Sequence, residues 1–141
     1  MKISKRALFF GTVILFIFIV ALSVQLSKNL QPEDALTEDF FKSDTSLTLE
    51  KINDMEFNEI DPSLEIQNEV KRLVKELKLK RTDSSFDPFD AEYVIGSKIN
   101  QDDQLYLFVD ENVIVFPNKS STGYKIKNND EFMETIDTLL N

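Results

Sequence analysis

The sequence predicts an α+β protein: an N-terminal transmembrane helix followed by a small domain with an antiparallel three- to five-stranded sheet and two helices. Three observations support this prediction. Residues 7–27 are uncharged and rich in Leu, Ile, Val and Phe. Apolar residues recur at helical spacing over 62–79, and short apolar runs separated by turn residues follow between 93 and 127, as in an antiparallel meander.

The uncharged segment is long enough to cross a membrane. At about 1.5 Å per residue, a helix from Ala7 to Ser27 spans the roughly 30 Å hydrocarbon core of a bilayer. Lys2, Lys5 and Arg6 precede the segment, and the first acidic residue, Glu33, follows it. The positive-inside rule therefore predicts that residues 1–6 form a cytoplasmic basic flank and that the rest of the chain lies outside the cytoplasm.

The same segment has two other interpretations, a cleaved signal peptide and a pilin-like leader. Ala21-Leu22-Ser23 offers small residues for cleavage of a signal peptide after Ser23, but the apolar run is longer than a signal core of about 7–15 residues. A pilin-like leader ending at Gly11 would need an acid where Phe16 stands. The absence of cysteine excludes a lipoprotein. A retained anchor is the favoured interpretation.

Residues 28–45 are predicted to form a stalk or linker that leads to an acidic domain over 46–141. Pro32 with two following acids suits the start of a short helix. The alternative for this segment is that its phenylalanines dock on the domain or lie at the membrane interface. Residues 46–60 show period-two patterning, which predicts one strand or a strand pair broken near Asn53-Asp54.

The strongest local prediction is a helix over 62–79, with Asp61 as its N-cap and Pro62 at its first position. A polar loop over 80–92 should follow. Strands are then predicted at 93–99, 104–109 and 113–117, and residues 124–127 are the candidate for a fourth. The C-terminal sequence NNDEFMETIDTLLN predicts a second helix, with inward residues Phe132, Met133, Ile136, Leu139 and Leu140.

The central strands are apolar on both faces. In strand 104–109, Leu105 and Leu107 point to one face while Tyr106 and Phe108 point to the other. Two helices on opposite faces, or a partner protein, must therefore cover the sheet. Coverage by the chain itself is the favoured interpretation. The alternative is a surface for a protein partner, made of Tyr106, Phe108, Ile114 and Phe116.

Composition excludes several kinds of chemistry. The chain has no cysteine and no histidine, so it offers no thiolate or imidazole for zinc, for nucleophilic attack or for proton relay. Three glycines leave no phosphate-binding loop. Without the three basic residues before position 7, 13 basic residues face 25 acidic ones, a net charge of −12. This balance is expected to repel nucleic-acid phosphates and anionic lipid headgroups.

Acidic residues are the remaining candidates for a site. Asp83, Asp87, Asp90 and Glu92 could bind calcium or act on a carbohydrate, but no Asp-x-Asp-x-Asp-Gly loop accompanies them. Further acids at 102–103 and 110–111 fall in turns at opposite ends of the meander. The favoured interpretation of all these clusters is solvated loop acids.

The sequence therefore predicts a single-pass membrane protein of a bacterial cell envelope, without catalysis, metal or cofactor. Its domain would bind a protein partner as an accessory, regulatory or immunity-type module, with no nucleic-acid or small-molecule ligand. The alternative is a secreted or anchored calcium-dependent or carbohydrate-acting module using loop carboxylates. The element order resembles that of small anchored domains in Gram-positive bacteria, a resemblance that carries no motif and assigns no site.

Overall fold

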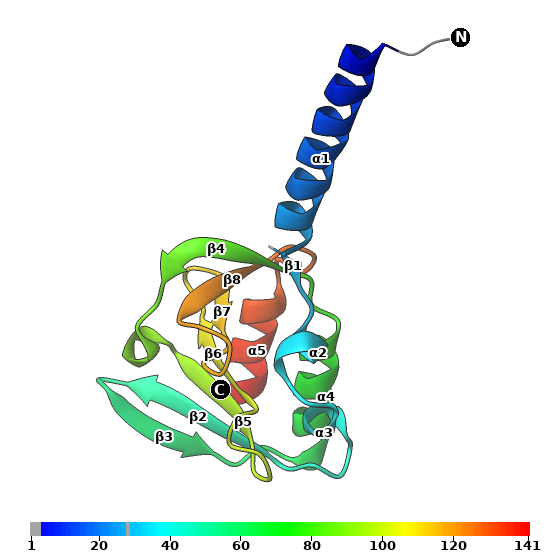
Figure 1. Cartoon of the computed structure of the whole chain (residues 1–141). Coiled ribbons are helices and arrows are strands. Elements are labelled where there is room, and N and C mark those ends of the chain that lie inside the picture. Colours follow the sequence, from blue (N-terminus) through cyan, green and yellow to red (C-terminus); the bar gives the residue numbers. More distant parts are fainter. Residues whose placement is uncertain (1–3, 28) are drawn as a thin grey trace.

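The computed structural model of the chain describes residues 4–27 and 29–141, and in the first helix the side chains up to Ser23. It contains a long N-terminal helix and a domain built on an antiparallel sheet with several short helices (Figure 1). The prediction of an α+β protein with an N-terminal apolar helix is confirmed. Lys2 of the predicted basic flank and Lys28 at the start of the predicted stalk lie outside the described residues.

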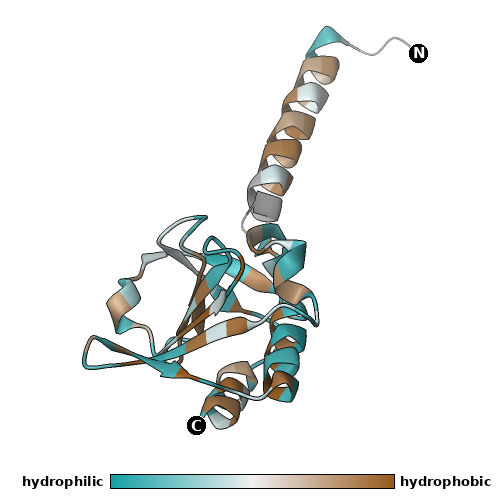
Figure 2. Cartoon of the chain, turned by 90° about the horizontal axis from the view of Figure 1, so that it is seen from below, coloured by the Kyte–Doolittle hydropathy of each residue, from teal (hydrophilic) through white to brown (hydrophobic). Residues whose placement is uncertain are grey.

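Helix α1 (Lys5–Ser27) has no polar face. Its described apolar side chains are exposed, and Figure 2 shows hydrophobic residues along much of its length. A helix that is apolar all round is stable only in a protein core or in lipid, and over Lys5–Ser23 no part of the domain buries this one. By length and composition α1 is able to cross a membrane, and a signal sequence would have the same properties.

The sheet contains eight strands, more than the three to five predicted. Their order is β1-β4-β8-β7-β6-β5-β2-β3, and every neighbouring pair is antiparallel. The bounds are β1 (Asn29–Leu30), β2 (Leu47–Asn53), β3 (Glu56–Ile60), β4 (Leu79–Ser85), β5 (Tyr93–Ser97), β6 (Gln104–Phe108), β7 (Val113–Val115) and β8 (Thr122–Ile126).

Two of the additional strands have sequences that do not look like strands. β1 is only two residues long, and β4 has the sequence LKRTDSS, in which Leu79 is the one apolar residue. β4 was predicted as part of a polar loop over 80–92. It forms a strand because it pairs with β8, not because of a buried apolar face. The predicted break near Asn53-Asp54 is confirmed as the β2–β3 turn, where Asp54 and Met55 adopt positive φ.

Four α-helices belong to the domain: α2 (Pro32–Ala35), α3 (Glu38–Phe41), α4 (Leu64–Lys75) and α5 (Phe132–Leu140); a short 3-10 turn, η1, covers Pro88–Asp90. Helix α4 is shorter than the predicted 62–79. Ser63, not Asp61, is its N-cap, since the Ser63 hydroxyl accepts from the Ile66 N–H at 3.4 Å. After Lys75 the chain turns into β4, so Leu77 and Leu79 are buried without being helical.

One face of the sheet carries the main core. All four domain helices contribute buried residues to it, among them Ala35, Phe40, Val74 and Ile136. Leu105, Leu107, Ile114 and Phe116 meet these helices from the sheet. The helices therefore lie on one face, whereas the sequence suggested one helix on each face.

The second face is covered by the chain segment that follows β4. A second core cluster there contains Ile52, Ala91, Val94, Phe108, Val113 and Val115. The Phe86 ring packs on Phe108 with 5.0 Å between centroids. The Phe86 ring can pack this close to the sheet because residue 123 is glycine. A Cβ at this position would lie 2.4 Å from Val113 and 2.5 Å from the Phe86 ring. The chain thus covers both faces itself, as the favoured interpretation expected.

The segment assigned to a stalk is docked on the domain. Phe40 is completely buried in the main core, as expected if its phenylalanines dock. The Thr37 N–H donates to the Asp103 carboxylate at 2.7 Å, and the Thr37 hydroxyl donates to the same group. The Lys71 ammonium donates to the Lys42 carbonyl at 2.6 Å. We call residues 29–45 the docked segment; its packing means that the folded domain begins well before residue 46.

A polar cluster at the C-terminus ties α5 to the sheet. The Tyr93 hydroxyl donates to the Asp137 carboxylate, and the Asn141 amide donates to both, at 3.1 Å and 2.8 Å. Burial, with help from the Asp137 charge, raises the pKa of Tyr93 to about 12. The hydrogen bond from Tyr93 lowers the pKa of Asp137.

Replacing Tyr93 with phenylalanine removes two hydrogen bonds, one of them to a carboxylate, and should cost about 1–3 kcal/mol near neutral pH. Native Tyr93 holds its proton at higher pH than the unfolded chain does, so its contribution is complete below about pH 10 and lost towards pH 12. The Asp137 contribution is present above the ordinary Asp pKa and lost as the pH falls through its lowered value. Denaturant titrations across pH should show a flatter profile at both ends for Y93F. Profiles parallel to wild type would contradict this coupling.

Candidate functional site

The structure does not bring the four residues of the predicted partner surface together. In the β6–β7 pairing Tyr106 lies opposite Val115 and Leu107 lies opposite Ile114. Directly opposed residues share a face. Tyr106 and Phe108 therefore lie on the second face, whereas Ile114 and Phe116 lie in the main core on the first.

Burial also removes these residues from contact with a partner. Phe108 is 1% exposed, while Ile114 and Phe116 are fully buried. Tyr106 alone is half-buried, packed beside the second core cluster. The proposed surface of Tyr106, Phe108, Ile114 and Phe116 is therefore not accessible as one surface in the folded domain. Its side chains pack in or against the two core clusters, one on each face of the sheet.

The loop acids do not gather in one place. Among the described residues no three acidic side chains lie close enough together to hold an ion. Asp87 caps η1 by accepting from the Phe89 N–H at 3.0 Å, and Glu92 accepts from the Val109 N–H at 2.8 Å. Asp103, expected to be a solvated loop acid, is fully buried and holds Thr37. These carboxylates satisfy backbone donors, and the calcium hypothesis finds no support in this arrangement.

Calcium is expected to leave the thermal stability of the protein unchanged. A site that bound calcium in the native state would raise the melting temperature as the ion was added, because only the folded state would hold the ligands together. A thermal-shift titration to millimolar calcium, with magnesium as the control ion, measures this. A calcium-specific rise that D83N/D87N abolishes would restore the hypothesis.

The most exposed apolar side chains of the domain that gather in one place lie at the outer edge of the sheet. β3 ends the strand order, so one of its backbone edges pairs with no other strand. Met55 in the β2–β3 turn is 74% exposed, and Phe57 and Phe89 are 43% and 52% exposed. The two phenylalanine rings pack edge to face with 6.0 Å between centroids. We call Met55, Phe57 and Phe89, together with the free edge of β3, the β3 edge surface.

This surface extends the second core cluster into solvent. Phe57 lies opposite Ile52 of that cluster in the β2–β3 pairing, and η1 brings Phe89 against it. The two rings thus form an apolar shelf beside an open strand. Exposed strand edges favour pairing with another chain, and exposed aromatic residues favour contact with a protein.

Acidic residues surround the β3 edge surface. Glu56 and Glu59 lie on β3 itself and are exposed, with Asp54 before the strand and Asp61 after it. Glu50 lies directly opposite Glu59 in the neighbouring strand, a like-charge pair that destabilises the free domain. Two copies of β3 would repel each other, whereas an extended segment carrying lysine or arginine would relieve the repulsion. The charges therefore select against self-pairing and for a basic partner.

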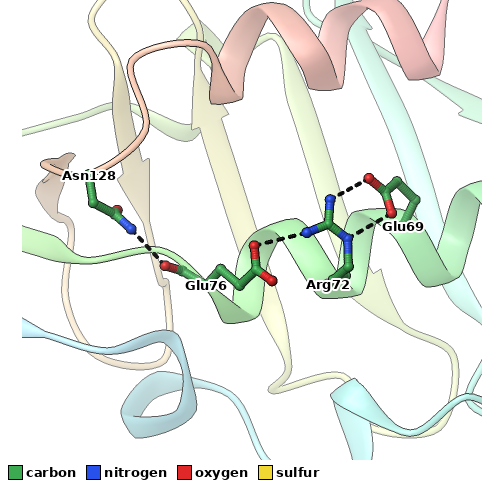
Figure 3. Close-up of polar contacts among 4 residues, drawn as sticks. All are labelled: Glu69, Arg72, Glu76 and Asn128. Carbon is green, nitrogen blue, oxygen red and sulfur yellow. Dashed lines mark hydrogen bonds and ion pairs between the residues drawn. The ribbon is translucent and has the colours of Figure 1, made fainter.

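A second open surface lies on the outside of α4, next to α5. This shallow groove is lined by Leu64, Ile66 and Leu139, with Glu65, Asn68, Glu69 and Arg72 at its rim. Arg72 is already engaged: it binds both oxygens of Glu69 at 2.9 Å and 2.6 Å and Glu76 at 2.9 Å (Figure 3). The hydrogen bonds from Arg72 lower the pKa of Glu69.

The same network ties α4 to the end of β8. The Asn128 amide donates to the Glu76 carbonyl at 2.8 Å (Figure 3). The Asn128 side-chain oxygen accepts from the Lys78 N–H at 2.7 Å. These contacts close the C-terminus of α4, where backbone carbonyls have no helical partner. We therefore assign the Arg72–Glu69–Glu76 network a structural role, because the two carboxylates already balance the charge of this cation.

Comparison of the chain with protein-family models, with curated proteins and with solved structures finds no match to any of them. We therefore infer function from the geometry of this chain. One feature of the sequence indicated the β3 edge surface: Met55 and Phe57 stand among acidic residues in a predicted strand pair. In the structure β2 has buried residues, whereas the residues of β3 are exposed or half-buried.

Proposed function

We propose that the protein is a non-enzymatic, single-pass envelope protein that presents its acidic domain outside the cytoplasm and binds a protein partner there. The apolar helix α1 and the basic residues before the apolar segment support the anchor and its direction. The β3 edge surface supports protein binding, since it joins an open strand edge to exposed aromatic rings.

The observation that carries the proposal is the free, acidic edge of β3. A partner that adds an extended segment to this edge would gain backbone hydrogen bonds, while its alternate side chains would meet Phe57 and the flanking acids. The Glu50–Glu59 opposition favours a partner segment with lysine or arginine at the facing position. The partner class is therefore a protein with an extended, basic and partly apolar segment.

The anchor is tested by external protease on intact cells that make the full chain with a C-terminal tag. The tag and domain should be digested while a membrane-bound N-terminal piece remains. Cells opened before digestion serve as the control for protease activity. A domain that is protected in intact cells, or a tagged chain that leaves the membrane on alkaline washing, would overturn the location.

The surface is tested by a photo-crosslinking amino acid at position 57, with position 64 as the matched control. Leu64 is an apolar residue more exposed than Phe57, 59% against 43%, but it lies on α4. We expect one discrete product from position 57 and none from 64. The double change E56K/E59K should abolish it, whereas D102K/E111K, which reverses two exposed loop acids, should not. Equal crosslinking from both positions would contradict the assignment of the site.

A further inference from the structure

The lysines of the acidic domain are not evenly spread. One residue separates the end of α1 from β1, and β1 pairs with the start of β4, with Asn29 opposite Lys80. β4 in turn pairs with the end of β8. Strands lie about 5 Å apart, so both strand ends lie within about 10 Å of the point where the chain leaves α1. Figure 1 shows α1 leaving the domain beside β1, β4 and β8.

Four lysines stand on one face of these two strand ends. Lys80 lies directly opposite Lys125. The Lys127 N–H donates to the Lys78 carbonyl at 2.9 Å, so Lys78 and Lys127 also lie side by side. The residues between them, Leu79 and Ile126, point into the main core and are 3% exposed. All four lysines are exposed on the opposite side. We call Lys78, Lys80, Lys125 and Lys127 the lysine patch.

The arrangement is unfavourable for the domain alone. Like charges directly opposed across neighbouring strands destabilise a sheet, and the patch contains two such oppositions. None of the ion pairs formed between described residues involves any of the four. Asp34 lines a shallow cavity with Lys78 and Lys127 and accepts from the Gln31 N–H at 3.1 Å. One carboxylate cannot balance four ammonium groups.

We propose that the lysine patch binds the anionic headgroups of the membrane that holds α1. This inference rests on the anchor of the proposed function, because the anchor is what keeps the patch beside the headgroups. The net negative charge of the whole domain predicts repulsion from such a surface, but the charges are unevenly distributed. Basic β4 and β8 lie near the end of the sheet next to the anchor, and acidic β3 lies at the other end. Headgroup attraction and acid repulsion then act together to hold the β3 edge surface away from the bilayer.

The test uses the full chain in lipid nanodiscs. The chain has no cysteine, so a single dye is placed by D130C, in the loop after the patch, or by N58C on β3. Energy transfer to a headgroup acceptor is compared between neutral phosphatidylcholine discs and discs with phosphatidylglycerol. We expect phosphatidylglycerol to raise energy transfer from position 130 but not from position 58. About 0.5 M salt shortens the Debye length to a few ångströms and should reverse this rise.

The paired variants decide the assignment. Each lysine near an anionic surface changes the ratio of docked to undocked domain by about fivefold, so K80Q/K125Q should lower it by about 25-fold. K98Q/K119Q removes two exposed lysines outside the patch and should leave it unchanged. Without lipid, K80Q/K125Q should melt no lower than wild type, since it relieves repulsion. A chain that leaves the disc would overturn the anchor and this inference; a retained chain with no phosphatidylglycerol response would overturn the lysine patch alone.

Discussion

Replacing Phe40 with alanine is expected to lower the free energy of unfolding by about 3–5 kcal/mol, the usual cost of deleting a buried aromatic ring. Phe40 is fully buried in the main core, and its ring meets Phe41 edge to face at 5.1 Å between centroids. The loss is expected even though Phe40 follows closely on the apolar helix α1, because the docked segment is part of the folded domain.

Urea unfolding of the full chain in detergent, followed by circular dichroism, measures this effect. Phe41 is half-buried and provides the matched control; F41A should cost about 1–2 kcal/mol, in proportion to the smaller area that it buries. If F40A does not fold at all, F40L keeps most of the apolar volume and should give a folded protein of intermediate stability. Equal, small effects of F40A and F41A would show that residues 28–45 form a free stalk.

Polar contacts reinforce the docking of this segment from several sides. Asp103 binds Thr37 through both carboxylate oxygens, and the Asn118 amide donates to the Ala35 carbonyl at 3.1 Å. Lys71 is 3% exposed, and burial lowers its pKa, yet its ammonium is held by backbone carbonyls of the segment. These contacts hold residues 29–45 on the domain; in the proposed anchored state they would also keep the lysine patch close to the headgroups.

Periodicity identified the elements that bury an apolar stripe. Helices α4 and α5 and the strands of the central meander follow from such patterns, because burial of a repeated face is what a sequence records. Helix α1 follows instead from the length of its uncharged apolar run. β4 was missed because its residues are polar, and its pairing with β8 depends on a distant segment. α2 and α3 are four residues each, too short for a helical period to appear. The prediction of a short helix at Pro32 is confirmed by α2 and came from Pro32 and the two acids after it.

The candidate site was harder to predict, because it depends on register. Alternation along β6 and β7 correctly divided each strand into two faces, but it does not say which face of one strand joins which face of the next. The turn between them fixes Leu107 opposite Ile114, and a shift of one residue would have reversed the assignment. Sequence alone also gave no reason to treat Asp103 differently from Asp102, although only Asp103 is buried.

The register makes a further large effect predictable: Phe108→Ala should cost about 3–5 kcal/mol, as for Phe40. Phe108 is 1% exposed beneath the Phe86 ring, so its removal leaves a cavity in the second core cluster. Tyr106 shares that face but is half-buried at its margin, and Y106A should cost markedly less.

Urea unfolding of the two single variants distinguishes a self-covered face from one that awaits a partner. If the second face were a docking surface, both variants would keep wild-type stability and lose only binding. If Phe86 and the chain around η1 cover it, F108A loses stability whether or not a partner is present. F86A should then lose stability too, because it uncovers Phe108 from above. Wild-type stability of both F108A and F86A would mean that the face is open, and it would return Tyr106 and Phe108 to the list of contact residues.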